Sequence, residues 1–152
     1  MPVGAWTLGL VLGELVAQQS SGRHLAIPVL GIESTVAINP LVVLGGETQG
    51  TYVPRAASTI GEGAGGFAGA LSAGVRIRRE RVTGESLLGA GVRVRAASFG
   101  GYDAVAIAPV VRVRFTAGWQ ATQAVAVRGG VGGWVGTDAL DLDATVGVAW
   151  CF

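Results

Sequence analysis

The last thirteen residues place the strongest constraint on what this chain can fold into. From Leu140 to Phe152 every even-numbered position is apolar, whereas the odd-numbered positions carry aspartate or small side chains. Successive side chains of a strand point to opposite faces, so this segment predicts a strand with one continuous apolar face. At roughly 3.3 Å per residue it spans about 40 Å, enough for a tilted strand to cross a hydrocarbon core of about 30 Å.

The composition agrees with a membrane barrel rather than with a helical membrane protein. Half of the 152 residues are hydrophobic and 14% are charged, against about 25% charged residues in an average soluble domain. No run of 18 uninterrupted apolar residues exists, which argues against a transmembrane helix. In a membrane barrel the apolar signal is instead spread over many short alternating strands. The length suggests one domain, residues 1–152.

The C-terminal segment resembles the last strand of bacterial outer-membrane β-barrel proteins, which alternates apolar residues and ends on Phe with another aromatic residue two positions earlier. The matching residues are Val146, Val148, Trp150 and Phe152. Over most of the chain the alternation is similar to that of small eight-stranded barrels of the OmpA, OmpX and opacity types. The resemblance implies an antiparallel up-and-down barrel in outer-membrane lipid, with a C-terminal signal that the barrel-assembly machinery reads.

The alternation divides the chain into eight expected strands, an even number as this class prefers. Their expected ranges are 3–17, 24–33, 34–45, 67–78, 84–98, 103–115, 119–129 and 140–152. Pro28 and Pro40 lie inside the second and third ranges and weaken them. Residues 46–66 are expected to form a long loop facing outside, and 129–138 a Gly-rich loop around Trp134. A tight turn is expected near residues 117–118.

The N-terminal segment has two interpretations. Trp6, Leu8, Leu10 and Leu12 alternate with smaller residues, which favours a first strand. The alternative is a degenerate secretion signal, although the segment has no positively charged start and carries Glu14.

Charged residues gather on the non-apolar faces of the expected strands. Seven arginines share this parity, Arg76, Arg78, Arg93, Arg95, Arg112, Arg114 and Arg128, and so do Glu85, Asp141 and Asp143. Their neighbours on these faces are Gly, Ala and Ser, which suits a crowded interior. An eight-stranded barrel is just wide enough for side chains to fill, and an Arg facing lipid at mid-membrane costs roughly 2–4 kcal/mol.

We therefore predict an arginine-rich lumen in which these arginines pair with the three acids. Arginine would exceed acid there, leaving some positive charge near the rims. The alternative interpretation is the solvated face of a soluble sandwich.

No catalytic or cofactor motif stands out. His24 is the only histidine and lacks an evident partner, the single cysteine permits no internal disulfide, and Gly61–Gly66 lacks the Lys and Ser/Thr of a phosphate loop. A net charge of +1 gives no basic footprint for nucleic acid. We expect a non-enzymatic integral outer-membrane barrel without cofactor or metal, with the 46–66 loop for surface interaction. The alternatives are a narrow anion-favouring pore, a soluble barrel that binds an apolar ligand, and an enzyme centred on His24.

Overall fold

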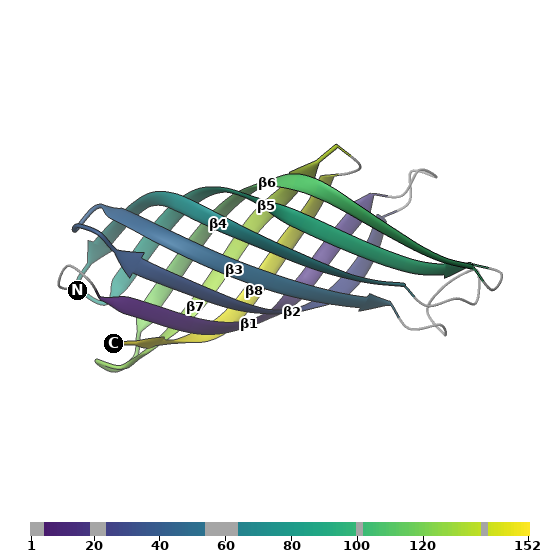
Figure 1. The fold of residues 1–152 in the computed structure, drawn as a ribbon. Helices are drawn as coiled ribbons and strands as arrows, with labels where there is room; N and C mark the ends of the chain where they lie inside the picture. The colour runs from purple at the N-terminus through teal and green to yellow at the C-terminus, as the bar shows by residue number, and fades with distance from the viewer. Residues whose placement is uncertain (1–4, 19–23, 54–63, 100–101, 138–139) are drawn as a thin grey trace.

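The computed structural model describes residues 5–18, 24–53, 64–99, 102–137 and 140–152. They form eight strands in chain order: β1 (Trp6–Gln18), β2 (His24–Ala37), β3 (Val42–Val53), β4 (Ala64–Arg79), β5 (Val82–Phe99), β6 (Tyr102–Gln120), β7 (Val125–Gly136) and β8 (Leu140–Cys151). Each strand pairs antiparallel with its sequence neighbours, and β1 pairs with β8 to close the barrel (Figure 1). The predicted fold class is confirmed. No helix among the described residues is long and apolar enough to cross a membrane.

Apolar side chains face outward and charged ones inward. On β5 the exposed fraction of Val92 is 49%, whereas that of Arg93 is 4%. On β6 the corresponding values are 46% for Val111 and 0% for Arg112. This is the reverse of a soluble barrel, in which water would take the charged face. The strand parity read from the sequence therefore assigns the two faces as expected.

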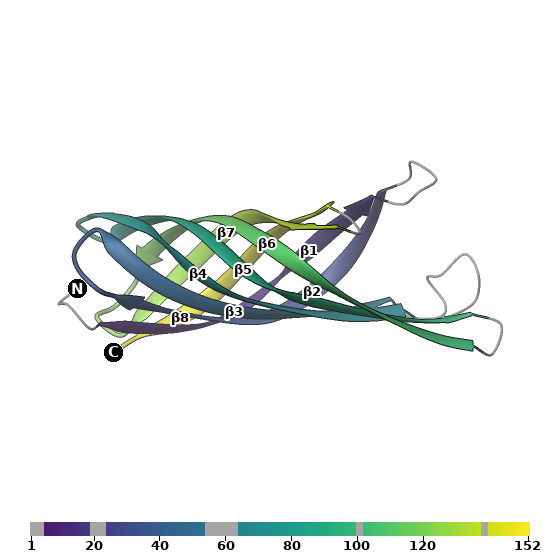
Figure 2. The same cartoon turned by 45° about the horizontal axis from the view of Figure 1, so that its top comes forward.

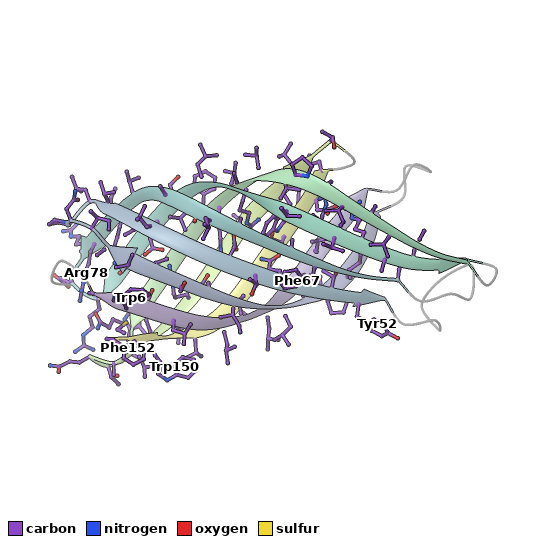
Figure 3. All side chains as sticks on the ribbon, in the orientation of Figure 1. Trp6, Tyr52, Phe67, Arg78, Trp150 and Phe152 are labelled. Carbon is purple, nitrogen blue, oxygen red and sulfur yellow. The ribbon has the colours of Figure 1, made fainter. Side chains whose placement is uncertain are left out.

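The outer surface is an apolar belt with aromatic side chains towards both of its ends. Trp6, Trp150 and Phe152 lie near one end of the barrel, and Tyr52 lies towards the other (Figure 3). Aromatic residues gather at the two interfaces of a membrane. One acid, Glu14, also sits on the outward face of β1, eight residues beyond Trp6 and towards the far end of the strand.

Three short turns lie at one end of the barrel, together with the start of β1 and the C-terminus (Figure 1). We call this the turn end and the opposite one the far end. The β2–β3 turn is held by Asn39, whose Oδ1 accepts the backbone N–H groups of Leu41 at 2.8 Å and Val42 at 2.7 Å. In the β6–β7 turn the hydroxyl of Thr122 accepts the N–H of Val125 at 3.0 Å. Side chains of this kind satisfy backbone donors that a turn leaves unpaired.

The predicted boundary between the second and third strands is wrong. β2 continues to Ala37 and the chain turns at residues 38–41, because Asn39 and Pro40 form the turn instead of interrupting a strand. Pro28 is accommodated in β2 because its described partner there is on β1, and pairing with β3 begins only at Val29. A proline has no N–H to donate, so it suits a position paired on one side.

Three predicted loops and turns are also wrong. Residues 46–53 belong to β3 and 64–66 to β4, so only 54–63 of the predicted 46–66 loop fall outside these strands, and they lie outside the described residues. The strand went unrecognised because its outward face carries Gly46, Thr48 and Gly50 in place of large apolar residues. Likewise β6 runs through 117–118 to Gln120, and β7 contains most of the predicted 129–138 loop, including Trp134.

Glycines in the barrel wall mark places where neighbouring strands approach too closely for a side chain. A Cβ on Gly91 would lie 1.9 Å from the carbonyl oxygen of Gly69, and one on Gly74 would lie 1.9 Å from that of Ser86. Both positions have lumen parity, where a small barrel bends its sheet most sharply. Glycine at such bends is how strands turn the corners of a closed barrel.

We expect Gly91→Ala to destabilise the folded barrel by about 1–3 kcal/mol, because its methyl group would displace backbone. The measurement is urea unfolding in detergent micelles. Gly84→Ala is the control, since nothing lies within 4 Å of a Cβ at that position. Equal stability of the two variants would refute the close-approach argument.

Candidate functional site

The described lumen contains a network of five buried arginines and five buried acids. The arginines are Arg76, Arg93, Arg112, Arg114 and Arg128, and the acids are Glu33, Glu47, Glu85, Asp141 and Asp143. We call these ten residues the lumen network. They come from every strand except β1. A buried charge is tolerated only when it is paired and hydrogen-bonded, and here the two signs are equal in number.

Arg112 lies at the centre of the lumen network and is fully enclosed. Its Nε donates to Glu47 Oε1 at 2.5 Å, and its two Nη atoms donate to Asp143 at 2.5 and 3.1 Å. The guanidinium also lies 4.5 Å from the ring centroid of Trp134, whose Nε1 donates to Gln49 Oε1 at 3.1 Å. A planar, permanently charged guanidinium is suited to this combination of bidentate pairing and stacking.

Towards the turn end the lumen network continues through Glu85 and Glu33. Glu85 accepts from Arg76 at 2.6 Å and from Arg128. Glu33 faces Arg128 at 3.0 Å and Arg114 at 2.6 Å. Each carboxylate therefore bridges two guanidinium groups, which links β2, β4, β5, β6 and β7 through side chains alone.

Towards the far end the lumen network finishes at Asp141. Its Oδ2 accepts from Arg93 at 2.7 Å and from Arg95 at 2.5 Å. The Arg95 side chain is 37% exposed, so the last guanidinium of the series reaches solvent. The charged interior thus runs from the turn end to the half-buried Arg95 at the far end.

The structure brings together eight of the ten residues expected to form the lumen charge network, and it places the other two at its ends. Arg95 is half-buried at the far end. Arg78 is exposed at the turn end, where it donates to Gln120 at 2.5 Å and to the carbonyl of Glu80 at 3.1 Å. Arg78 therefore lies outside the enclosed network, and its described acceptors are neutral.

Three residues of the C-terminal motif lie on the outward face of β8, and the fourth, Phe152, follows the last residue of that strand. Their exposed fractions are 59% for Val146, 40% for Val148, 39% for Trp150 and 77% for Phe152. The backbone of Phe152 exchanges hydrogen bonds with Trp6, at 2.9 and 3.2 Å, which joins the two ends of the chain at the seam. The motif thus occupies the strand that closes the barrel.

Sequence reasoning missed four residues that complete the interior: Glu33, Glu47, Gln49 and Trp134. The first was placed at the end of a strand and the other three in loops, so their parity was never applied. The signal was present, because Glu47 and Gln49 share the parity of Val43, a fully buried residue of β3. With Glu33 and Glu47 included, the enclosed charges balance, and the expected arginine excess is confined to the ends.

Charged side chains and Trp134 fill the middle of the described interior, and Leu15, Val29 and Val110 belong to a buried apolar cluster with Trp134. Among the described residues no group of three or more His, Cys, Asp or Glu is placed to hold a metal ion. The side chain of His24, the centre of the enzyme alternative, lies outside what the structure describes.

No protein-family model matches the sequence, and no curated protein is significantly similar to it. Solved structures are similar in fold. The attachment invasion locus protein Ail of Yersinia pestis matches with a TM-score of 0.78 and 12% identity, over 99% of this chain and 100% of Ail. Neisserial surface protein A, NspA, matches with 0.81 and 13%, over 98% and 99%. The N-terminal β-barrel domain of Pseudomonas aeruginosa OprF matches with 0.77 and 10%, over the full length of both.

The fold and the charged lumen define the class: this chain has the architecture of the small eight-stranded outer-membrane β-barrels. The resemblance expected from the C-terminal motif is confirmed at the level of fold. At 10–13% identity the likeness rests on strand number, closure and alternation, not on shared side chains.

We expect Arg112→Ala to destabilise the folded barrel by about 3–5 kcal/mol, since it leaves Asp143 buried without its described guanidinium partner and Glu47 with Arg114 alone. Urea unfolding followed by tryptophan fluorescence measures the change. Arg78→Ala is the matched control, and its effect should stay within about 0.5 kcal/mol because the side chain is exposed. A loss for Arg112→Ala no larger than that of the control would contradict a structural role for the lumen network.

Proposed function

We propose that this protein is a non-enzymatic integral β-barrel of the bacterial outer membrane, in which the barrel is an anchor and the far end is displayed outside the cell. Its partners would be outer-membrane lipid and, through Val146, Val148, Trp150 and Phe152, the barrel-assembly machinery. The observation that carries the proposal is the apolar belt around a charged lumen. In water this arrangement would expose the apolar faces of all eight strands, whereas in lipid it places every buried arginine away from hydrocarbon.

The dimensions of the belt support this environment. On β4 the outward face runs from Phe67 through Leu71 to Ile77, with exposed fractions of 53%, 78% and 70%. About ten residues of a strand tilted by roughly 45° cover the apolar thickness of a membrane. Short turns face the periplasm in this class, so the turn end would be periplasmic and the far end extracellular.

Leu71→Arg tests the environment directly. Leu71 lies near the middle of the belt, so in lipid the substitution should cost about 2–4 kcal/mol and reduce the heat-modifiable folded form on gels. In a water-soluble barrel the same exposed change would be nearly neutral.

The control for this test is Leu41→Arg. Leu41 has a similar exposure of 62% but lies in the turn at residues 38–41, where water would surround it. Identical folding yields for Leu71→Arg, Leu41→Arg and the parent protein in bilayer vesicles would reject the membrane proposal.

The surface for interaction, in this proposal, is a sheet that extends beyond the barrel at the far end. β5 and β6 have 18 and 19 residues, whereas β7 and β8 have 12 each, and the β5–β6 hairpin projects past the other strands (Figures 1 and 2). β6 pairs with β5 from Tyr102 onwards but with β7 only from Val110. Among the described residues, 102–109 therefore have a ladder partner on one side only.

An unpaired strand edge offers backbone donors and acceptors to an extended polypeptide. This edge carries Val105 and Ile107, which are 65% and 71% exposed, so an added strand would gain apolar contacts as well as hydrogen bonds. The projecting sheet includes the ends of β3 and β4, which fall within the predicted 46–66 recognition segment. We infer that recognition uses this sheet, with an extended peptide segment as the kind of partner it fits.

Hydrogen exchange tests whether the edge is open. In the folded barrel, amides of residues 104–108 that point away from β5 should exchange at least about 100-fold faster than those of 111–119, which are paired on both sides. Residue-resolved exchange by NMR in micelles measures this. Uniform protection along β6 would show that the edge is already covered and would remove the recognition surface from the proposal.

The balanced charges of the lumen network favour an anchor over the anion-favouring pore. A pore of that kind needs uncompensated positive charge along an open path. In the described lumen the central guanidinium of Arg112 is instead neutralised by two acids and is completely enclosed.

A further inference from the structure

The turn end of the barrel contains a cavity of about 290 Å³ that lies between the lumen network, the β2–β3 turn and the ends of β4 and β6. Its charged lining consists of Arg76, Arg78, Arg128 and Glu85, and Gln120 and Cys151 also line it. We call this cavity the vestibule. Its volume is close to the lower limit of small-molecule pockets, which is about 300 Å³.

The charges that line the vestibule are unequal. Three arginines face one glutamate, and that glutamate already accepts hydrogen bonds from Arg76 and Arg128. Glu33, behind the lining, also faces Arg128 at 3.0 Å. The remaining positive charge is that of Arg78, whose described acceptors are an amide oxygen and a backbone carbonyl.

Most of the remaining wall is apolar, although Thr7, Asn39 and Thr83 also line it. Ala37, Leu41, Ala126 and Ala149 line the vestibule beside the arginines. Low-dielectric walls focus the field of a charge into the space between them, which raises the local concentration of counter-ions. A guanidinium at the mouth of such a space presents several N–H donors in one plane, a geometry that matches carboxylate and phosphate oxygens.

We propose that the vestibule is a binding site for a small anion, a phosphate or a short-chain carboxylate, held by the guanidinium of Arg78. The anion would take the place of the neutral acceptors of Arg78, and a short apolar part would lie against the alanines of the wall. The site is distinct from the extracellular sheet and does not depend on it. Only its assignment to the periplasmic side rests on the proposed function.

Cys151 supplies a reporter, because it is the only cysteine of the chain and lies in the vestibule wall. The experiment compares the rates at which the folded barrel in micelles reacts with an anionic and a cationic methanethiosulfonate of similar size. Each rate is divided by that of free cysteine in the same buffer. At low ionic strength the anionic reagent should be favoured by about tenfold, the lower end of electrostatic focusing in clefts.

Two substitutions localise the effect. Arg78→Gln should bring the normalised ratio close to one. Arg81→Gln removes the same charge from the neighbouring turn, but Arg81 does not line the vestibule, so the ratio should be largely kept. Both side chains are exposed, and gel mobility of the unboiled protein verifies that each variant is folded.

Protection completes the test. Inorganic phosphate or butyrate should slow the labelling of Cys151 saturably, and more than chloride at equal ionic strength does. The anion that protects identifies the chemistry preferred. A ratio at or below one, equal losses in both variants, protection no better than chloride, or a cysteine that reacts only after unfolding would each overturn the proposal. None of these results bears on membrane insertion, which Leu71→Arg tests separately.

Discussion

The pairing of guanidinium with carboxylate inside a closed sheet is the interaction on which this structure depends. Arg112 is completely enclosed, yet both edges of its guanidinium meet acids, Glu47 from β3 and Asp143 from β8. An ion moved from water into a low-dielectric interior loses several kcal/mol of solvation, which only close, hydrogen-bonded partners restore. The lumen network therefore requires strands from opposite sides of the barrel to be in register.

Closure of the sheet provides that register and removes the edges that lipid would not tolerate. The seam between β1 and β8 is continuous from Thr7 to Ala17 and is completed by the exchange between Trp6 and Phe152. Closing only eight strands demands sharp bends, and Gly74 and Gly91 permit them because any side chain there would meet a neighbouring carbonyl. The small diameter of the barrel thus accounts both for the small residues in its wall and for the long charged side chains that fill its lumen.

The two ends of the barrel differ in ways that bear on function. At the turn end, tight turns and the lumen network enclose a vestibule with a positive excess. At the far end, β5 and β6 extend beyond the neighbouring strands and leave one edge of β6 unpaired. The middle, where charges balance, separates the two. A barrel with different surfaces at its two ends follows from the unequal lengths of the strands.

The sequence by itself determined the class of fold and the outward and inward faces of most strands. It also placed eight of the ten buried charged residues on the strand faces that carry small residues. It did so because side-chain direction in a strand has a period of two, which needs no knowledge of the partner strand. The strand prediction failed at β3 and β7, because the outward face there carries small or polar residues in place of large apolar ones, and the alternation is not visible. These residues are Gly46, Thr48, Gly50 and Gly133. Pro40 was placed inside a strand for a related reason. When the partner strand is unknown, a proline in a turn cannot be distinguished from a proline that interrupts a strand.

Only the tertiary structure decided which charges meet. Glu33 and Arg128 are far apart in the chain but face each other at 3.0 Å, and Trp134 reaches Gln49 from the opposite wall. The stagger of strands around the barrel sets these encounters, and it also sets where β7 stops pairing with β6. Alternation fixes the face of a residue, whereas its height along the axis depends on the register of all eight strands at once.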